Sequence, residues 1–234
     1  MARYPRSWTL DQGLSFHKTW RGHNREWNLK TNEEKRMYTT LLTEEHKKRC
    51  QSSNPLHAIC IMSNHSHEIY TLENLHSFSE FMRQHHGRYG MYFNRKHART
   101  GKVAQERPKT TSIQNDHHEM MAVLYIHANP IRAGICKDAK DYIWSTHKLY
   151  AFGIKPRWMK SIDIAFPHWY LNLGNSWKER QKVYRKIFNS YLKKFGLLKL
   201  TFSSHGFGEY TWVISRQTML KEKRKFLHST APPP

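Results

Sequence analysis

The chain has 234 residues, of which 39 are Lys or Arg and 18 are Asp or Glu, and its formal net charge is +21. Such an excess favours a polyanionic partner, because lysines and arginines that contact phosphates release condensed counterions. No stretch approaches the roughly 18 to 20 continuous apolar residues of a spanning helix and no apolar signal segment opens the chain, so we expect a cytoplasmic protein without a membrane partner.

The three cysteines, Cys50, Cys60 and Cys136, are widely spaced and include no C-x-x-C pair. An odd set of this kind indicates neither a disulfide framework nor a cysteine zinc site. The chain is 38% hydrophobic and 13% aromatic, which suffices for a substantial core. This composition fits one large domain or a domain with an extension.

The first part of the chain predicts a strand followed by a helix. Residues 13–25 alternate as a strand does, and they end in basic and polar groups. Residues 32–49 follow a helical period, with Met37, Leu41 and Leu42 on the inner face.

Residues 57–70 predict two strands that meet at a turn formed by Ser63 and Asn64. His65 and His67 stand at i and i+2 on the second strand, so their side chains project from the same face. Two imidazoles placed in this way can bind one metal ion. Since the chain has 17 histidines, a chance pair is an alternative of comparable weight on this motif alone.

A second helix is expected over about residues 77–94, and from Arg83 to Lys109 basic side chains are interleaved with aromatic ones. Cations interleaved with rings suit single-stranded DNA, which offers phosphates and unstacked bases. The alternative for part of this set is a solvated charged face. The predicted DNA-binding residues are Arg83, Arg88, Tyr92, Arg95, Lys96 and Arg107.

The segment 115–130 predicts a helix in which Asp116 and Glu119 form a capping box and Pro130 ends the helix. Tyr125 and Asn129 then lie one turn apart on the same face. An amide oxygen is a ligand for Mg²⁺ or Mn²⁺, and a tyrosine beside such an ion is a candidate nucleophile toward phosphate. The alternative is that the tyrosine packs in the core and the asparagine caps the helix.

After residue 150 the sequence predicts an accessory region and a tail. A basic helix is expected from Trp177 to about Phe195, capped by Asn175 and Ser176, and it either binds DNA or braces the core. The end of the chain, from Lys221 to Pro234, is basic and then proline-rich, and we expect it to be disordered. The predicted division is therefore a core at 1–150, a basic helical region at 151–220 and a tail at 221–234.

Several motifs together resemble those of a known family over about residues 10–150. In chain order they are Ser63-Asn64-His65-Ser66-His67, Met82-Arg83 leading to Tyr92-Phe93-Asn94-Arg95, residues 101–107, residues 125–134, and Tyr142-Ile143-Trp144-Ser145-Thr146. This series resembles the REP-associated tyrosine transposases, which are single-tyrosine members of the HUH endonuclease superfamily.

The resemblance implies an α+β fold: a ferredoxin-like antiparallel sheet with helices on one face, here with a helical C-terminal extension. It implies that His65, His67 and Asn129 hold a divalent metal, Mg²⁺ or Mn²⁺, and that Tyr125 is the nucleophile. The implied substrate is hairpin-bearing single-stranded DNA, cleaved through a 5′-phosphotyrosyl intermediate. Single-tyrosine relatives include monomers and homodimers, so both states stay open.

Three positions depart from the family pattern. Ser66 and Glu68 stand where apolar residues are usual, and Pro108 follows Arg107 where an aromatic residue is expected. Both strand residues alternate away from the histidine face, so Ser66 is expected to weaken the packing behind the strand.

Two alternative functions are a DNA-binding protein that has lost catalysis and an RNA-binding protein that uses the same sheet. The joint presence of both histidines, the tyrosine and the asparagine argues against both.

Overall fold

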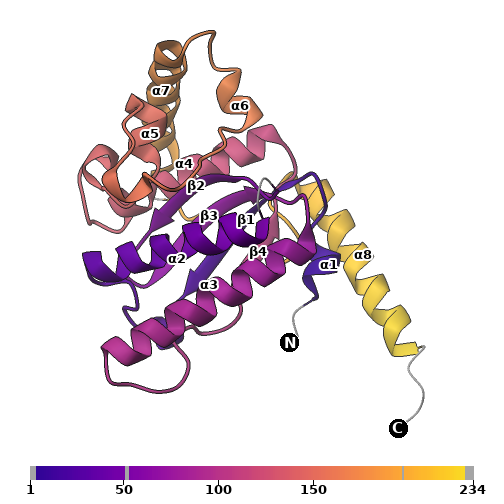
Figure 1. The fold of residues 1–234 in the computed structure, drawn as a ribbon. Coiled ribbons are helices and arrows are strands. Elements are labelled where there is room, and N and C mark those ends of the chain that lie inside the picture. Colours follow the sequence, from indigo (N-terminus) through magenta and orange to yellow (C-terminus); the bar gives the residue numbers. More distant parts are fainter. Residues whose placement is uncertain (1–3, 51–52, 197, 230–234) are drawn as a thin grey trace.

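The computed structural model describes residues 4–50, 53–196 and 198–229 (Figure 1). Its elements are α1 (Arg6–Thr9), β1 (Ser15–Arg21), η1 (His23–Arg25), α2 (Asn32–Cys50), β2 (Leu56–Ile61), β3 (His65–Thr71), α3 (Leu75–Lys96), β4 (Lys109–Ser112), α4 (Asp116–Arg132), η2 (Ala139–Asp141), α5 (His147–Phe152), η3 (Arg157–Met159), α6 (His168–Leu171), α7 (Trp177–Phe195) and α8 (Tyr210–Ser229). In these ranges no helix has the length and apolarity to cross a lipid bilayer.

The four strands form one antiparallel sheet in the order β2-β3-β1-β4. The central strands β1 and β3 pair so that Thr19 lies opposite His67 and Arg21 lies opposite His65. The helices α2 and α3 connect β1 to β2 and β3 to β4, and both cover the same face of the sheet (Figure 1). This β-α-β-β-α-β order is the ferredoxin-like α+β arrangement that the sequence predicted, with a helical C-terminal extension.

The predicted boundaries of the early elements are close to the observed ones. The helices α2 and α3 each lie within about two residues of their expected ends, and Gly87 and Gly90 do not interrupt α3. The first strand is shorter than predicted and ends at Arg21. The chain turns there because Asn24 and Arg25 adopt positive φ angles of 47° and 63°, which no strand accommodates.

A buried ion pair lies between the sheet and the two helices that cover it. The Lys18 ammonium lies 2.7 Å from the Glu68 carboxylate, and both side chains are 0% exposed. The hydroxyls of Tyr38 and Tyr70 donate to the same carboxylate at 2.8 and 2.7 Å. Burial raises the pKa of Glu68, but Lys18 and the Tyr70 hydroxyl outweigh burial and hold this pKa below its usual value.

Ser66 belongs to this buried cluster, which corrects the expectation that it weakens the packing behind the strand. Its hydroxyl donates to the Glu68 carboxylate at 2.9 Å and lies 2.8 Å from the Tyr38 hydroxyl. Both unusual residues of the histidine strand therefore serve one polar network on the face opposite the histidines. The serine hydroxyl stabilises this network, because an apolar side chain at position 66 would leave the Glu68 carboxylate with one hydrogen-bond donor fewer.

The tyrosine helix α4 packs against the other face of the sheet, and its start differs from the prediction. Asn115 is the N-cap, and its side chain accepts a hydrogen bond from the backbone N–H of His118. Glu119 is not part of a capping box. Its carboxyl is buried and accepts a hydrogen bond from the Ser15 hydroxyl at 2.9 Å, which ties the helix to the start of β1.

Pro130 does not end α4, which continues to Arg132. Proline removes its own N–H from the helical ladder, and its ring crowds the carbonyl four residues earlier. The following turn is still bonded, since the N–H groups of Ala133 and Ile135 donate to the carbonyls of Asn129 and Pro130, each at 2.9 Å. The predicted stop was therefore about two residues early.

The basic helix α7 braces the tyrosine helix. It begins at the predicted cap, where Ser176 and Glu179 form a capping box. Its inner face buries Tyr184, Phe188 and Tyr191. The Tyr184 hydroxyl lies 2.6 Å from Nδ1 of His127 on α4. This contact supports the bracing role, and DNA binding by α7 stays a prediction.

The last helix, α8, corrects the expectation of a disordered tail from residue 221. It runs to Ser229, so residues 221–229 are helical, while 230–234 lie outside the described residues. Arg216 anchors the helix to the core: its guanidinium donates to the carbonyls of Thr9 and His205 at 2.8 and 2.6 Å and pairs with Asp11. The local composition resembles that of a disordered segment, but these tertiary contacts hold the helix in place.

Glu68→Gln is expected to destabilise the fold by about 3–5 kcal/mol, because it leaves the Lys18 charge buried without a counter-charge. Urea unfolding followed by circular dichroism measures the loss. The control is Glu80→Gln, which breaks the exposed pair with Arg83 and should change the midpoint little. Equal midpoints for the two variants would contradict a structural role for the buried pair.

Glu119→Gln should change the pH dependence of stability. Burial raises the pKa of Glu119 from 4.5 to about 7, so the folded chain holds a proton there that the unfolded chain releases. The contribution of this carboxyl to the free energy of unfolding is complete below pH 4.5, and it is lost as the pH rises from there through the folded pKa of about 7. The variant lacks this loss of roughly 3 kcal/mol. Its free energy of unfolding in urea, relative to that of the wild type, should therefore rise between pH 5 and pH 8.

Candidate active site

The structure brings the two histidines of β3 together with the tyrosine of α4. The rings of His65 and His67 are 4.8 Å apart between centroids and nearly perpendicular. The His67 ring lies 6.1 Å from the Tyr125 ring, again nearly perpendicular. The strand alternation that the sequence predicted therefore places both imidazoles on the face where α4 packs.

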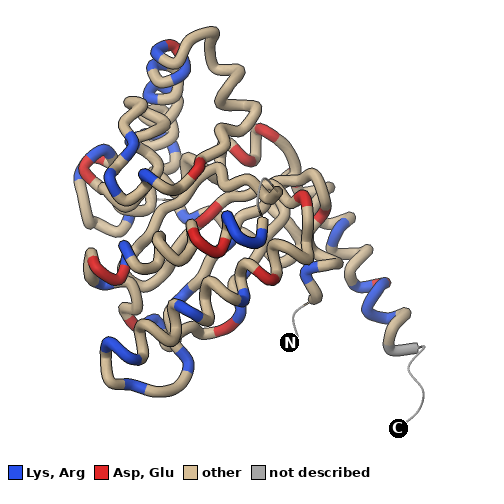
Figure 2. The backbone as a smooth tube through the Cα atoms, viewed as in Figure 1, with Lys and Arg blue, Asp and Glu red and all other residues tan. Residues whose placement is uncertain are grey.

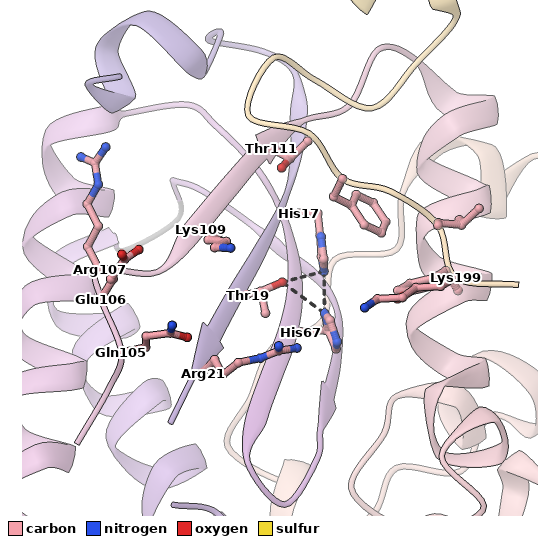
Figure 3. Close-up of a pocket in the computed structure, with 13 residues that line it drawn as sticks. His17, Thr19, Arg21, His67, Gln105, Glu106, Arg107, Lys109, Thr111 and Lys199 are labelled. Atoms are coloured by element: carbon pink, nitrogen blue, oxygen red, sulfur yellow. Dashed lines mark hydrogen bonds between the residues drawn. The ribbon is translucent and has the colours of Figure 1, made fainter. Parts of the chain in front are cut away.

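A third imidazole, which the sequence analysis missed, contacts His67 (Figure 3). Nε2 of His17 on β1 lies 2.8 Å from Nδ1 of His67. The Thr19 hydroxyl is within 3.2 Å of the same His67 nitrogen and 3.3 Å of the His17 nitrogen. The signal available in the sequence was the alternation of His17, Thr19 and Arg21 on one face of a strand, but only the register with β3 brings them to His67.

His65 and His67 are neutral at physiological pH, so each keeps one ring nitrogen with a lone pair. Burial and the nearby Arg21 lower the pKa of His65 to about 4, and burial with its charged neighbours holds the pKa of His67 well below its usual value. Nδ1 of His65 lies 2.5 Å from the Asn64 amide oxygen, which only accepts hydrogen bonds. That contact places the proton on Nδ1 and leaves Nε2 of His65 as the free donor atom.

Asn129 lies one turn after Tyr125, as predicted, and an arginine holds both residues. Nη2 of Arg132 donates to the Asn129 amide oxygen at 2.5 Å and to the Tyr125 carbonyl at 2.9 Å. The guanidinium carbon lies 4.0 Å from the centroid of the Tyr125 ring. The Asn129 amide nitrogen is buried and has no hydrogen-bond partner among the described residues. Arg132 therefore fixes the amide and the phenol relative to each other.

The residues present fit a divalent metal in their chemistry. Neutral imidazole nitrogens and an amide oxygen are accepted metal donors, and the amide oxygen retains a second lone pair beside its bond to Arg132. Within the described residues, no cluster of three or more His, Cys, Asp or Glu side chains is arranged to hold a metal. An ion at this place would therefore depend on His65, His67 and the oxygen of Asn129.

A cationic cavity of about 240 Å³ opens beside His67 and Tyr125 (Figure 3). The charged side chains of its lining are Arg21, Glu106, Arg107, Lys109 and Lys199. Four of these five are positive, so the cavity suits a phosphate group. The cations come from β1, from β4 and the loop before it, and from the connector 198–209 between α7 and α8, segments that are far apart in the sequence. His65 and Asn129 do not line this cavity.

The Tyr125 phenol is protonated at neutral pH. Burial raises its pKa above the usual value of 10.0, although Arg132 and Arg21 act in the opposite direction. The ring is 5% exposed and packs against Phe202 of the connector, with centroids 5.3 Å apart. These two arginines are the groups that would stabilise a phenolate.

Most of the predicted DNA-binding residues lie away from this cavity. Arg83, Arg88, Tyr92, Arg95 and Lys96 belong to α3, on the other face of the sheet. Four of them contact carboxylates: Arg83 pairs with Glu80, Arg88 with Glu44 and Glu45, and Tyr92 and Lys96 with Glu33. Only Arg107 lines the cavity. Their role in DNA binding stays a prediction, while Arg21 and Lys199 are cations that the sequence analysis missed.

Comparison with known proteins bears on the fold. No family model and no curated protein matches the chain. A solved structure of a REP-associated tyrosine transposase bound to a REP hairpin is similar, with a TM-score of 0.51 and 22% sequence identity. The similarity covers 72% of this chain and 96% of that one. At this identity the likeness shows that the two chains share a fold.

His67→Ala is expected to abolish Mn²⁺ binding measured by calorimetry, because two remaining ligands cannot replace three. His17→Ala should weaken binding by about 10–100-fold, since it removes a group that orients His67. The control is His117→Ala, which changes an exposed histidine at the start of α4. Binding that is unchanged in the His67 variant would contradict the metal site.

Proposed function

We propose that the chain cleaves single-stranded DNA by transesterification, with Tyr125 as the nucleophile. The observation that carries the proposal is the position of the Tyr125 phenol on the wall of a cationic cavity, beside the imidazole of His67. A buried tyrosine packed only as core would not need four cations in the lining of the cavity beside it. A phosphodiester in the cavity would place its charge near Arg21, Lys109 and Lys199.

In the proposed reaction the phenol oxygen attacks phosphorus and the bond from phosphorus to the 3′ oxygen breaks. The products are a 5′-phosphotyrosyl ester and a free 3′-hydroxyl. The phenol loses one proton and the 3′ oxygen gains one, so protons and charge balance. The energy of the phosphodiester is kept in the tyrosyl ester, which a new 3′-hydroxyl can attack, as a transposase requires.

Two arginines would assist the nucleophile. Arg132 is held by the carbonyls of Tyr125 and Leu198 and by the Asn129 amide, so its charge stays fixed over the phenol ring. Arg21 also lowers the pKa of this phenol. Both would favour the phenolate as the proton leaves, without reorganisation at that moment.

Mg²⁺ or Mn²⁺ held by His65, His67 and Asn129 would polarise the phosphoryl oxygens and neutralise the charge that develops on them. The chain's own contribution is to keep both imidazoles neutral and oriented. Asn64 orients His65, and His17 with Thr19 orients His67. Such supporting contacts are a regular part of metal sites in proteins.

The proposed substrate is single-stranded DNA that carries a hairpin. The solved structure with the same fold is bound to a REP hairpin, which supports this class of ligand. The net charge of +21 supports a polyanion in general.

A second candidate is a DNA-binding protein that does not cut. The observation that favours it is the short contact of Arg132 with the Asn129 oxygen, which places a cation beside a proposed metal ligand. Detection of a covalent DNA adduct separates the two candidates.

Tyr125→Phe should abolish the covalent adduct with labelled, hairpin-bearing single-stranded DNA in Mn²⁺ or Mg²⁺, while DNA affinity stays nearly unchanged. The variant removes only the nucleophilic oxygen. A denaturing gel measures the adduct, and the control that should retain it is Tyr210→Phe, at an exposed residue that starts α8. Undiminished cleavage by the Tyr125 variant would refute the assignment.

A further inference from the structure

A second, larger cavity adjoins the one beside Tyr125. Its volume is about 580 Å³, and it is lined by β4, the connector 198–209, α8 and residues near α1. Four residues line both cavities, namely Arg107, Lys109, Thr111 and Phe202. A chain that passes the tyrosine along β4 would therefore enter the second cavity directly.

The second cavity is also cationic, and α8 supplies two of its charges. Lys221 and Arg224 of α8 line it together with Arg107 and Lys109, and no Asp or Glu is among the described residues that line it. Lys221 and Arg224 stand at i and i+3, with Gln217 one turn earlier, so a single face of the helix borders the cavity. Figure 2 shows this run of basic residues along α8.

The basic face of α8 is held in place by the core. Arg216 donates to the carbonyls of Thr9 and His205 and pairs with Asp11, and all three of these residues lie outside α8. His205 itself lines the cavity. The charges of Lys221 and Arg224 are thus presented by an anchored helix and not by a free tail.

Aromatic side chains accompany the cations. Tyr4, Phe202 and His205 line the cavity, and the rings of Tyr4 and His205 are 6.4 Å apart between centroids. Sites for single-stranded nucleic acid combine a positive groove with rings on which bases stack. A small anion would use the cations alone and would leave these rings without a role.

We propose that this second cavity binds the single-stranded DNA next to the scissile phosphate, with Lys221 and Arg224 contacting its phosphates. The inference rests on the proposed function, because the path of the strand into the second cavity assumes that its scissile phosphate lies at Tyr125. A strand that is unpaired at the tyrosine continues unpaired into the adjoining cavity. The C-terminal helix would then act as one wall of the substrate channel.

The test compares a DNA hairpin alone with the same hairpin carrying a short single-stranded extension at its 5′ or 3′ end. All proteins are full-length and carry Tyr125→Phe, so that binding is measured without cleavage. Fluorescence anisotropy gives the affinity over a series of salt concentrations. The test variant is Lys221→Ala with Arg224→Ala. The matched control is Lys223→Ala with Lys225→Ala, which removes the same charge from residues of α8 outside the cavity lining.

We expect one of the extensions to tighten binding by the parent protein. The Lys221 and Arg224 variant should lose that gain and bind the bare hairpin as before. For the extended DNA, its slope of log K against log salt should be shallower by up to about 1.4, because two phosphates lose their cations. The control should keep both the gain and the slope.

Three outcomes would overturn the proposal: no gain from either extension, a gain that survives in the test variant, or an equal loss in the control. A duplex extension that gives the same gain, lost in the same variant, would overturn the assignment to single strands. Adduct formation by the chain with Tyr125 intact is scored separately. If no adduct forms, the proposed function fails. If the test variant keeps the gain in affinity from the extension, only the proposed role of the second cavity is refuted.

Discussion

The pairing of β1 with β3 determines both faces of the sheet. On one face Lys18 meets Glu68, and on the other Thr19 meets His67 and Arg21 meets His65. A slip of one residue in β3 would turn the buried carboxylate toward Tyr125 and the histidines toward α2 and α3. Because the ion pair of Lys18 and Glu68 is fully buried, such a slip would leave two charges uncompensated. The polar network behind the sheet thus fixes the register that positions the imidazoles in front of it.

Contacts at three points along the tyrosine helix α4 restrict the position of the Tyr125 phenol. Glu119 ties its start to Ser15, and His127 ties its middle to Tyr184 of α7. Arg132 ties its end to the carbonyl of Leu198 in the connector. A reactive group on a braced helix keeps its geometry better than one on a loop. This bracing assigns a structural purpose to the C-terminal extension, because α7 and the connector both belong to it.

The sequence predicted the local parts of the candidate site and missed those that depend on distant pairing. Strand alternation located His65 and His67, and helical spacing located Tyr125 and Asn129, because each pair is set by a few adjacent residues. His17 and Lys199 reach the site only through sheet register and through the path of the connector, which no local pattern encodes. Charge density along α3 did not locate this cavity for the same reason, since composition does not reveal which face of the sheet a helix covers.

The charges around Tyr125 also constrain how a metal and DNA would bind together. Arg132 lies 2.5 Å from the oxygen proposed as the third metal ligand, and the neighbouring cavity holds four cations and one carboxylate. A divalent ion alone would be repelled by this field, and the buried imidazoles offer no charge to offset it. A phosphodiester brings negative charge to the same place. Metal and DNA would therefore favour each other's binding, and linkage makes that coupling equal in both directions. In this arrangement the site would be completed by its substrate, so the chain would bind the metal more tightly in the presence of DNA than in its absence.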